Sequence, residues 1–328
     1  MKFDIGIPSS REGLCVPVPY AGPEEIIKII QASERLGYDA IWGPDFITRT
    51  KGMGGIQDTA PPNWYELLIT LAYAAAVTER VKLGAFILLP YRDPIILAKQ
   101  VAALDQFSKG RLLLGVGLGM ARDEFEAIRT RERKAHRGKM MDEKMESLHL
   151  LLSHDSDEVS FRGEYVEFQG VNLHPKPVQD PLPVYVPGTT PQALPRIARW
   201  GSGLMMSAAK APEAAGALSS VLKEHGRTLS EIDVIAEAQL CLAPTHEGAV
   251  EKYRNSRLGQ FRLARGAEIS SLVAANWIGT PDEAVEKINK VKEKGITHFN
   301  ALHTAGDTVE ETMEQMQMFA EEVIPLCK

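Results

Sequence analysis

The sequence has little of several features that mark particular classes of protein. Its 328 residues include only three cysteines, which stand far apart and form no CxxC pair. We therefore expect neither a disulfide framework nor a structural zinc site, and this usage fits the reducing cytoplasm. No run of about 18 apolar residues is present, so no membrane span is expected. The short apolar run near the N-terminus reads as a strand rather than a signal peptide.

Positive charge is also scarce. The formal net charge is −6, which argues against a general nucleic-acid binder because such proteins present a basic stripe. The eight histidines form no cluster with metal-ligand spacing, so no metal is expected. No P-loop, HExxH motif or nucleophile elbow occurs either. The charge itself says little about a small-molecule partner, which we expect here as a substrate.

What the sequence does have is a regular alternation of strand-like and helix-like segments. Short apolar runs separated by helical spacing predict βαβ units with parallel strands. Eight such runs can be counted, at 3–7, 38–42, 81–89, 111–116, 182–186, 203–206, 232–242 and 297–302. This pattern predicts an α/β fold, a (β/α)8 TIM barrel, rather than an open doubly wound sheet. We expect one domain over 1–328, with insertions near 43–63, 153–181 and 245–277.

The segments between these strands predict helices and one hairpin. Helical spacing is found at 23–36, 64–78, 94–107, 123–152, 281–294 and 309–326. A small hairpin is expected at 159–168, around Arg162-Gly163-Glu164.

A basic turn and a glycine-rich strand end stand together at 104–119, LDQFSKGRLLLGVGLG. Ser108 to Arg111 is interpreted as a structural turn at the strand's entry, on the stability face of a barrel. A GxGxxG frame starting at Gly115 would place Met120 at the third glycine, so a dinucleotide fingerprint is not met. Gly117, Gly119 and Met120 lie at the strand's exit. They predict either a tight bend or close approach of backbone to a flat cofactor ring.

A second segment combines a strand, small polar residues and a helix start. Gly188, Thr189 and Thr190 follow the strand at 182–186 and precede a helical pattern. Free N–H groups at a helix N-terminus, with two hydroxyls, favour an anion such as phosphate. Thr190 as a simple N-cap is the competing interpretation. Ser207, at the end of the next strand, is expected on the same side of the barrel.

These segments closely resemble the bacterial luciferase-like family of flavin oxidoreductases. The resemblance spans nearly the whole chain, in the family's order, at 27–42 (IKIIQASERLGYDAIW), 81–98, 104–119, 161–186 (with PKPVQ), 278–299 (IGTPDEAVEKINKVKEKGITHF) and 319–326. It implies a luciferase-like TIM barrel that holds FMN, or alternatively the deazaflavin F420, at the C-terminal ends of the strands. It also implies a cytoplasmic enzyme and a homodimer.

The resemblance also implies roles for individual residues. The backbone at Gly188, Thr189 and Thr190 would hold the cofactor phosphate. A non-proline cis peptide bond near Ala85, Phe86 and Ile87 would support the face of the ring. Such a bond costs about 3 kcal/mol or more, so it would mark a functional constraint.

Three positions depart from the family's pattern. Phe46 stands where many members carry a histidine, and Leu118 stands where luciferase carries an arginine. Met120 stands where the F420-dependent sugar-phosphate dehydrogenases carry a carboxylate. We therefore expect neither a luciferase nor a sugar-phosphate dehydrogenase, and the family's acid–base residue has no counterpart here.

Three other residues are candidates for catalysis. Asp45 at a strand end could act as a base, Tyr20 in the first loop could donate a hydrogen bond, and His136 could face the pocket. The competing interpretations are a salt-bridge partner, a packing residue and a solvated helix residue. Arg11 and Arg49 are interpreted as surface cations.

The function expected from this reasoning is an FMN-dependent monooxygenase. It would use reduced FMN, from a separate NAD(P)H flavin reductase, and O2 to oxidise a small organic substrate, because the cofactor performs the difficult chemistry. The alternative is an F420-dependent reductase or dehydrogenase that transfers a hydride. A flavin-binding protein without turnover stays open as well. A Schiff-base aldolase is disfavoured, since the expected strands contain only Lys2 and Lys82, both near strand starts.

Overall fold

The computed structural model describes residues 1–53, 60–155, 157–188 and 192–327, and within them eight parallel strands form a closed barrel. The pairing of β8 with β9 and of β11 with β1 completes the ring. In order around the barrel these strands are β1 (Lys2–Gly6), β2 (Ala40–Pro44), β3 (Lys82–Leu88), β4 (Leu112–Gly117), β7 (Val184–Pro187), β8 (Gly203–Ser207), β9 (Asp233–Leu242) and β11 (His298–Thr304). The predicted TIM barrel is confirmed, and each predicted strand corresponds to one of these eight.

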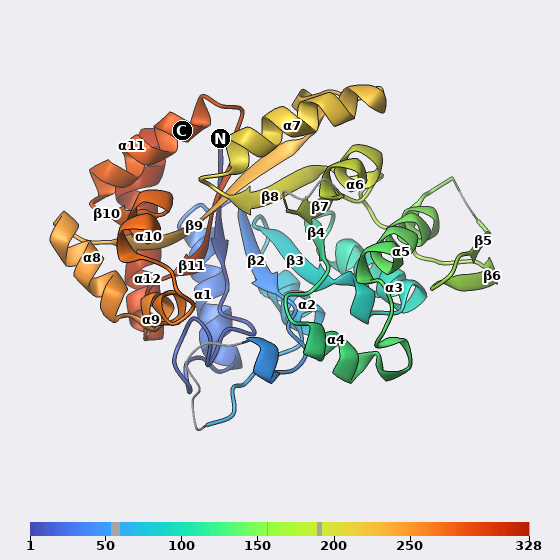
Figure 1. The fold of residues 1–328 in the computed structure, drawn as a ribbon, viewed down its shortest axis with the longest axis horizontal. Coiled ribbons are helices and arrows are strands. Elements are labelled where there is room, and N and C mark those ends of the chain that lie inside the picture. The colour runs from blue at the N-terminus through green and yellow to red at the C-terminus, as the bar shows by residue number, and fades with distance from the viewer. Residues whose placement is uncertain (54–59, 156, 189–191, 328) are drawn as a thin grey trace.

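Helices cover the outside of the barrel (Figure 1). They are α1 (Pro23–Arg35), α2 (Leu67–Val77), α3 (Pro94–Phe107), α4 (Arg122–Ile128), α5 (Arg137–Leu152), α6 (Ala193–Trp200), α7 (Ala211–Glu224), α8 (His246–Asn255), α9 (Arg257–Leu263), α10 (Ile269–Ala275), α11 (Pro281–Lys292), α12 (Val309–Met318) and α13 (Ile324–Cys327). None of the described helices is both long enough and apolar enough to cross a membrane. Helix α2 is apolar even on its outer side, where Ile69 and Tyr73 are exposed. The expected homodimer stays a prediction.

Two insertions carry secondary structure of their own. The hairpin of β5 (Val159–Arg162) and β6 (Glu167–Val171) confirms the predicted one, and it projects on the side of the barrel away from α8 to α12 (Figure 1). The stretch after β9 forms α8, α9 and α10 and ends in a short strand, β10 (Trp277–Gly279). This strand was not predicted, and it pairs with the C-terminal end of β9 outside the eight-membered ring.

Three predicted helices differ from the structure. The charged stretch 123–152 breaks after Ile128, because the imidazole of His136 caps a new helix by accepting from the Lys139 amide at 3.2 Å. The helix predicted from residue 64 begins later, where Glu66 caps α2 by accepting from the Ile69 amide. The last predicted helix is interrupted by a π-helical segment, Phe319–Val323. Residues 129–135 have high helix propensity, so the break after Ile128 could not be predicted from the sequence pattern.

The basic turn at 104–111 is structural, as predicted. Buried Asp105 accepts hydrogen bonds from the amides of Leu112, Val178 and Gln179, so it joins β4 to the chain that enters β7. The Arg111 guanidinium donates to the carbonyls of Ala75, Thr78, Val81 and Ser108 and to the Thr78 hydroxyl. These bonds tie α2, β3 and β4 together at the N-terminal end of the barrel.

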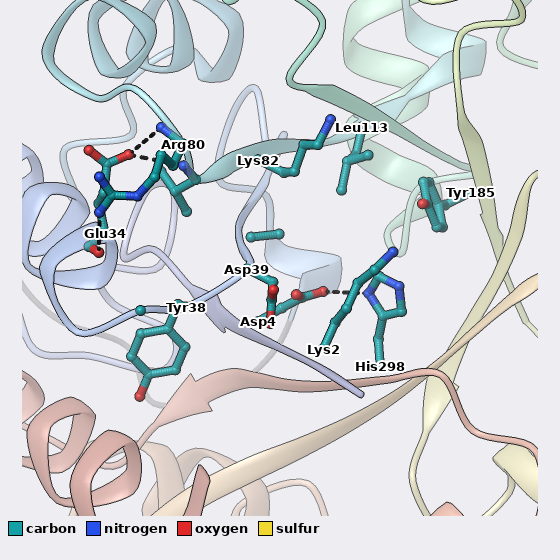
Figure 2. A pocket seen from close by; sticks show the side chains of 13 residues that line it. Lys2, Asp4, Glu34, Tyr38, Asp39, Arg80, Lys82, Leu113, Tyr185 and His298 are labelled. Carbon is teal, nitrogen blue, oxygen red and sulfur yellow. Dashed lines mark hydrogen bonds and ion pairs between the residues drawn. The ribbon is translucent and has the colours of Figure 1, made fainter. Parts of the chain in front are cut away.

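A charged cluster closes that end of the barrel. His298 of β11 lies 3.3 Å from an oxygen of Asp4 and 3.3 Å from an oxygen of Asp233. The Tyr185 hydroxyl donates to Asp233 at 2.9 Å, and the Trp42 indole donates to Asp4 at 3.0 Å. Figure 2 shows the side chains of His298, Asp4 and Tyr185 at one edge of a cavity of about 380 Å³. Opposite charges thus pair with one another inside the barrel.

The cluster also shifts the pKa of its members. Burial alone would lower the pKa of His298, but its hydrogen bonds to Asp233 and Asp4 outweigh burial and raise the pKa to about 9. Burial disfavours ionisation of Asp233, yet its bonds to His298 lower its pKa to about 2. At neutral pH the cluster therefore holds the His298 imidazolium beside the Asp233 carboxylate.

The raised pKa of His298 predicts how stability depends on pH. The stabilising effect is fully present below about pH 6.5, where the histidine of the unfolded chain is also protonated, and it is lost as the pH rises through about 9. A shift of this size corresponds to about 3 kcal/mol. Urea unfolding at a series of pH values should show this loss in the wild type but not in His298→Gln. The exposed His225→Gln control should behave as the wild type; equal slopes in all three proteins would contradict the assignment.

Candidate active site

The mouth of the barrel lies at the C-terminal ends of the strands, where acidic side chains hold the loops in place. Buried Glu12, in the loop after β1, accepts from the amides of Tyr20, Ala21 and Asn63. Glu124 at the start of α4 accepts from the amides of Ile47 and Thr48, in the loop after β2. A ligand at the mouth would therefore meet a loop framework that is already assembled.

The glycines of β4 make room for an aromatic ring. A Cβ built at Gly115 or at Gly117 would lie 3.0 Å from the Phe86 ring. Phe86 is partly exposed at the mouth, so this ring forms part of its floor. Ala85 and Ile87 alternate with Phe86 along β3 and are buried in the main core outside the ring of strands. Of these three predicted cofactor contacts, only Phe86 presents its side chain to the mouth.

The predicted non-proline cis peptide bond is wrong. The described residues contain three cis bonds, and each precedes a proline: Val18-Pro19, His174-Pro175 and Asp180-Pro181. The backbone at Ala85, Phe86 and Ile87 is an ordinary strand that pairs with β2 and β4 on its two sides.

The loop after β4 is held by side chains from two other segments. The Arg137 guanidinium donates to the Gly119 carbonyl at 3.0 Å, and the Tyr91 hydroxyl donates to the Ala121 carbonyl at 3.2 Å. Gly119 has φ of 85°, and a Cβ there would lie 2.3 Å from the Tyr91 hydroxyl. Gly119 is therefore required by a left-handed backbone and by the packing of Tyr91. Met120, beside it, is about half exposed.

The predicted phosphate segment is described only in part. Gly188 follows β7 with φ of 113°, and its amide donates to the Met205 carbonyl at 3.2 Å. Ser207 is exposed at the end of β8, the neighbouring strand. Thr189 and Thr190 lie outside the described residues. The phosphate site stays a prediction.

The three predicted catalytic residues all have structural partners. Buried Asp45 receives the Arg92 guanidinium at 2.5 and 3.0 Å, together with the Leu88 amide. The Tyr20 hydroxyl is bonded to Thr312 and Thr308 at the start of α12. His136 is exposed and caps α5. These contacts correspond to the competing interpretations of a salt-bridge partner, a packing residue and a solvated helix residue, and the catalytic roles are unsupported.

Polar groups that the sequence reasoning missed lie on the other side of the mouth. Arg11 was interpreted as a surface cation, but its side chain is buried in the loop after β1. Its Nη1 donates to the Leu302 carbonyl and to Nδ1 of His303, the latter at 2.7 Å. Because an arginine can only donate, Nδ1 of His303 is the acceptor and Nε2 carries the ring proton. Arg11 thus sets the tautomer of His303.

Glu237 of β9 completes this group. It alternates with Ile235, which packs inside the barrel, so it faces inward as well. Burial raises its pKa to about 7, although Arg11 and Arg262 lower it in part. Burial and these two arginines hold the pKa of His303 well below its usual value, which keeps the imidazole neutral. The mouth therefore holds a carboxyl whose pKa is raised towards neutrality and an uncharged imidazole, both near the Arg11 guanidinium.

One sequence signal could have located Glu237. The middle of the strand DVIAEAQLCL is mostly apolar. Glu237 interrupts it two residues after Ile235, whose side chain points inward. His303 gives no such signal, because a register shift between Ala301 and His303 sets the direction of its side chain. A β-bulge of this kind cannot be read from strand periodicity.

The Asp45–Arg92 pair generates a test of its role. Asp45→Asn removes one of the two carboxylate partners of the Arg92 guanidinium, which keeps Glu66, and we expect a loss of about 1–3 kcal/mol in the free energy of unfolding. Glu66 also contacts Arg92 but is one-third exposed, so Glu66→Gln should change stability by about 0–1 kcal/mol. Urea unfolding measures both. An Asp45→Asn protein as stable as the wild type but without activity would instead restore Asp45 as a catalytic candidate.

Known proteins similar to this chain match most of its length. A profile of the luciferase-like monooxygenase family matches residues 1–298. The F420-dependent glucose-6-phosphate dehydrogenase of Amycolatopsis mediterranei is 30% identical, over 93% of this chain and 94% of that protein. Limonene 1,2-monooxygenase of Rhodococcus erythropolis is 25% identical, over 91% and 80%.

Solved structures share the fold at lower identity. A monooxygenase from Streptomyces bottropensis superposes with a TM-score of 0.79 at 23% identity, covering 99% of both chains. An F420-dependent secondary alcohol dehydrogenase superposes with a TM-score of 0.77 at 21% identity, covering all of both chains. Profile, relatives and fold agree, and the chain belongs to the luciferase-like monooxygenase family, a family of oxidoreductases.

Proposed function

We propose that this protein is an F420-dependent oxidoreductase that transfers a hydride between the cofactor and the hydroxyl or carbonyl carbon of a small substrate. The observation that carries this proposal is Glu237, an inward-facing carboxyl with a pKa of about 7 at the barrel mouth. Oxidation of an alcohol by hydride transfer releases a hydroxyl proton, and a group with such a pKa can accept it near neutral pH. The F420-dependent relative at 30% identity supports the same choice.

The mouth has features that fit a tricyclic cofactor with a phosphate. Both side-chain amide atoms of buried Asn300, on the inward face of β11, have no hydrogen-bond partner among the described residues, as expected of a group that meets a polar ring edge. Phe86 supplies a flat apolar surface, and the backbone at Gly188 would hold the phosphate. When bound, F420 supplies the carbon that carries the hydride.

The protein's own residues would then manage the proton. Glu237 accepts the substrate's proton in the oxidative direction and returns it in the reductive direction. His303, neutral and protonated at Nε2, donates a hydrogen bond that orients the substrate oxygen. Arg11 is a positioning residue, because it fixes the His303 tautomer through the 2.7 Å contact. In this arrangement Glu237 of β9 supplies a carboxylate. It would take the place of the one that F420-dependent sugar-phosphate dehydrogenases carry at the position of Met120.

The role of Glu237 predicts a pH profile. In alcohol oxidation, kcat/KM should fall below about pH 7, where the carboxylate becomes protonated. Glu237→Gln should lower kcat by about 10²–10⁴-fold and abolish this limb. The exposed Glu251→Gln control on α8 should keep both rate and profile. A Glu237→Gln enzyme with an unchanged profile would rule out this base.

A second candidate is the FMN-dependent monooxygenase expected from the sequence. The observation in its favour is the apolar character of one side of the mouth, where Leu118 and Met120 are exposed beside Phe86. Such a surface suits an apolar substrate, and limonene 1,2-monooxygenase is among the relatives.

Cofactor titration decides between the two candidates. Purified protein should be titrated with F420, FMN and reduced FMN, followed by absorbance and fluorescence. We expect F420 to bind at least about tenfold more tightly than either form of FMN, which is a difference of about 1.4 kcal/mol. Preference for reduced FMN, with O2 consumption, would favour the monooxygenase. Tight binding without turnover of any alcohol or carbonyl compound would favour a flavin-binding protein.

A further inference from the structure

The Arg11 guanidinium has more hydrogen-bonding capacity than the chain satisfies. Its Nη1 is engaged by Leu302 and His303, but Nε and Nη2 are buried without a partner among the described residues. The side chain is only 6% exposed, so water gives little compensation. Buried charged donors are strongly unfavourable unless an acceptor meets them. Their presence at the mouth points to an acceptor that arrives with a ligand.

Glycine at position 6 of β1 leaves space for this guanidinium. A Cβ at Gly6 would lie 2.8 Å from Nη2 of Arg11 and 1.9 Å from the Leu302 carbonyl oxygen. Any other residue at position 6 would collide with the Leu302 backbone and crowd the guanidinium. Glycine at this position therefore lets β1, Leu302 and Arg11 lie close together.

A second arginine adds positive charge. Arg262 of α9 is close enough to Arg11 and His303 to lower the pKa of both, and its Nε is also buried without a partner in the part of the chain that the structure describes. Glu237 is the nearby carboxylate, but no hydrogen bond or ion pair joins it to either arginine within the described residues. Two guanidiniums thus share one weakly ionised counter-ion, and an anion would balance them.

We propose that Arg11, with Arg262, binds an anionic group of the substrate, a carboxylate or a phosphate. This rests on the proposed function. Arginine suits the task because its planar fork meets two oxygens of such a group at once.

The position of Arg11 assigns the anion to the substrate rather than to the cofactor. Arg11 lies against β1 and β11, whereas the expected cofactor phosphate seat follows β7, four strands away from β1 in either direction round the ring. An anion on Arg11 and a phosphate at Gly188 would therefore occupy opposite sides of the mouth.

The test uses cofactor-saturated protein titrated with inorganic phosphate by calorimetry, with chloride at equal ionic strength as the salt control. Phosphate should bind the wild type, and Arg11→Gln should weaken it by at least about tenfold. Arg11→Lys keeps the charge without the fork and should fall between them. The exposed Arg254→Gln control on α8 should bind phosphate as the wild type does. If Arg11→Gln does not fold, Arg262→Gln on the more accessible helix α9 gives the same comparison.

The outcomes separate this proposal from the proposed function. A cofactor-loaded protein that ignores phosphate, or an Arg11→Gln protein that binds phosphate normally, would overturn it. Phosphate that displaces the cofactor would assign the anion site to the cofactor and overturn the substrate assignment. If no cofactor binds, the proposed function fails, and phosphate titration of the unliganded wild type against Arg11→Gln then decides this proposal alone.

Discussion

The alternation of side chains along β1, β9 and β11 is the constraint on which both ends of the barrel depend. At the N-terminal end it places His298 between Asp4 and Asp233, so that opposite charges pair. Further along the same inward faces come Gly6 and Glu237, with Arg11 laid over Gly6. There the Arg11 guanidinium has no carboxylate paired with it among the described residues. The same three strands thus provide an ion-paired cluster that stabilises the fold and an unpaired guanidinium that is available to ligands.

The fold could be predicted because its signals are local and repeated. Each barrel strand is a short apolar run bounded by turn residues, and the turn at 108–111 is closed by the bond from Arg111 Nε to the Ser108 carbonyl, three residues away in sequence. Helix boundaries were less predictable where one side chain decides them. His136 restarts a helix inside a stretch whose composition favours a continuous one. Strand β10 was missed because its three residues gain their pairing from the far end of β9.

The candidate site was harder to predict, since its residues acquire their properties from distant parts of the chain. Arg11 is buried because Gly6 and the Leu302 carbonyl receive it, which a loop arginine does not reveal in sequence. His303 owes its direction to a bulge and its neutrality to burial and Arg11. The prediction for Asp45 failed in the opposite way. In the sequence, a carboxylate at a strand end resembles a catalytic base, but in the structure Asp45 is paired with Arg92.

These contacts explain why the family resemblance predicted the fold correctly but did not predict the catalytic residues. The loop after β2 places Asp45 in an ion pair, and the loop after β4 is held by Tyr91 and Arg137, so neither offers a free carboxylate or imidazole among its described residues. The groups left to handle a proton come from β9, β11 and the loop after β1. In the proposed reaction, proton transfer would proceed from the side of the barrel opposite β4, with the apolar surface of Phe86 facing it. A substrate held between these two sides would meet a polar, proton-accepting face and an apolar one, and this asymmetry would fix which face of its reacting carbon is presented to the cofactor.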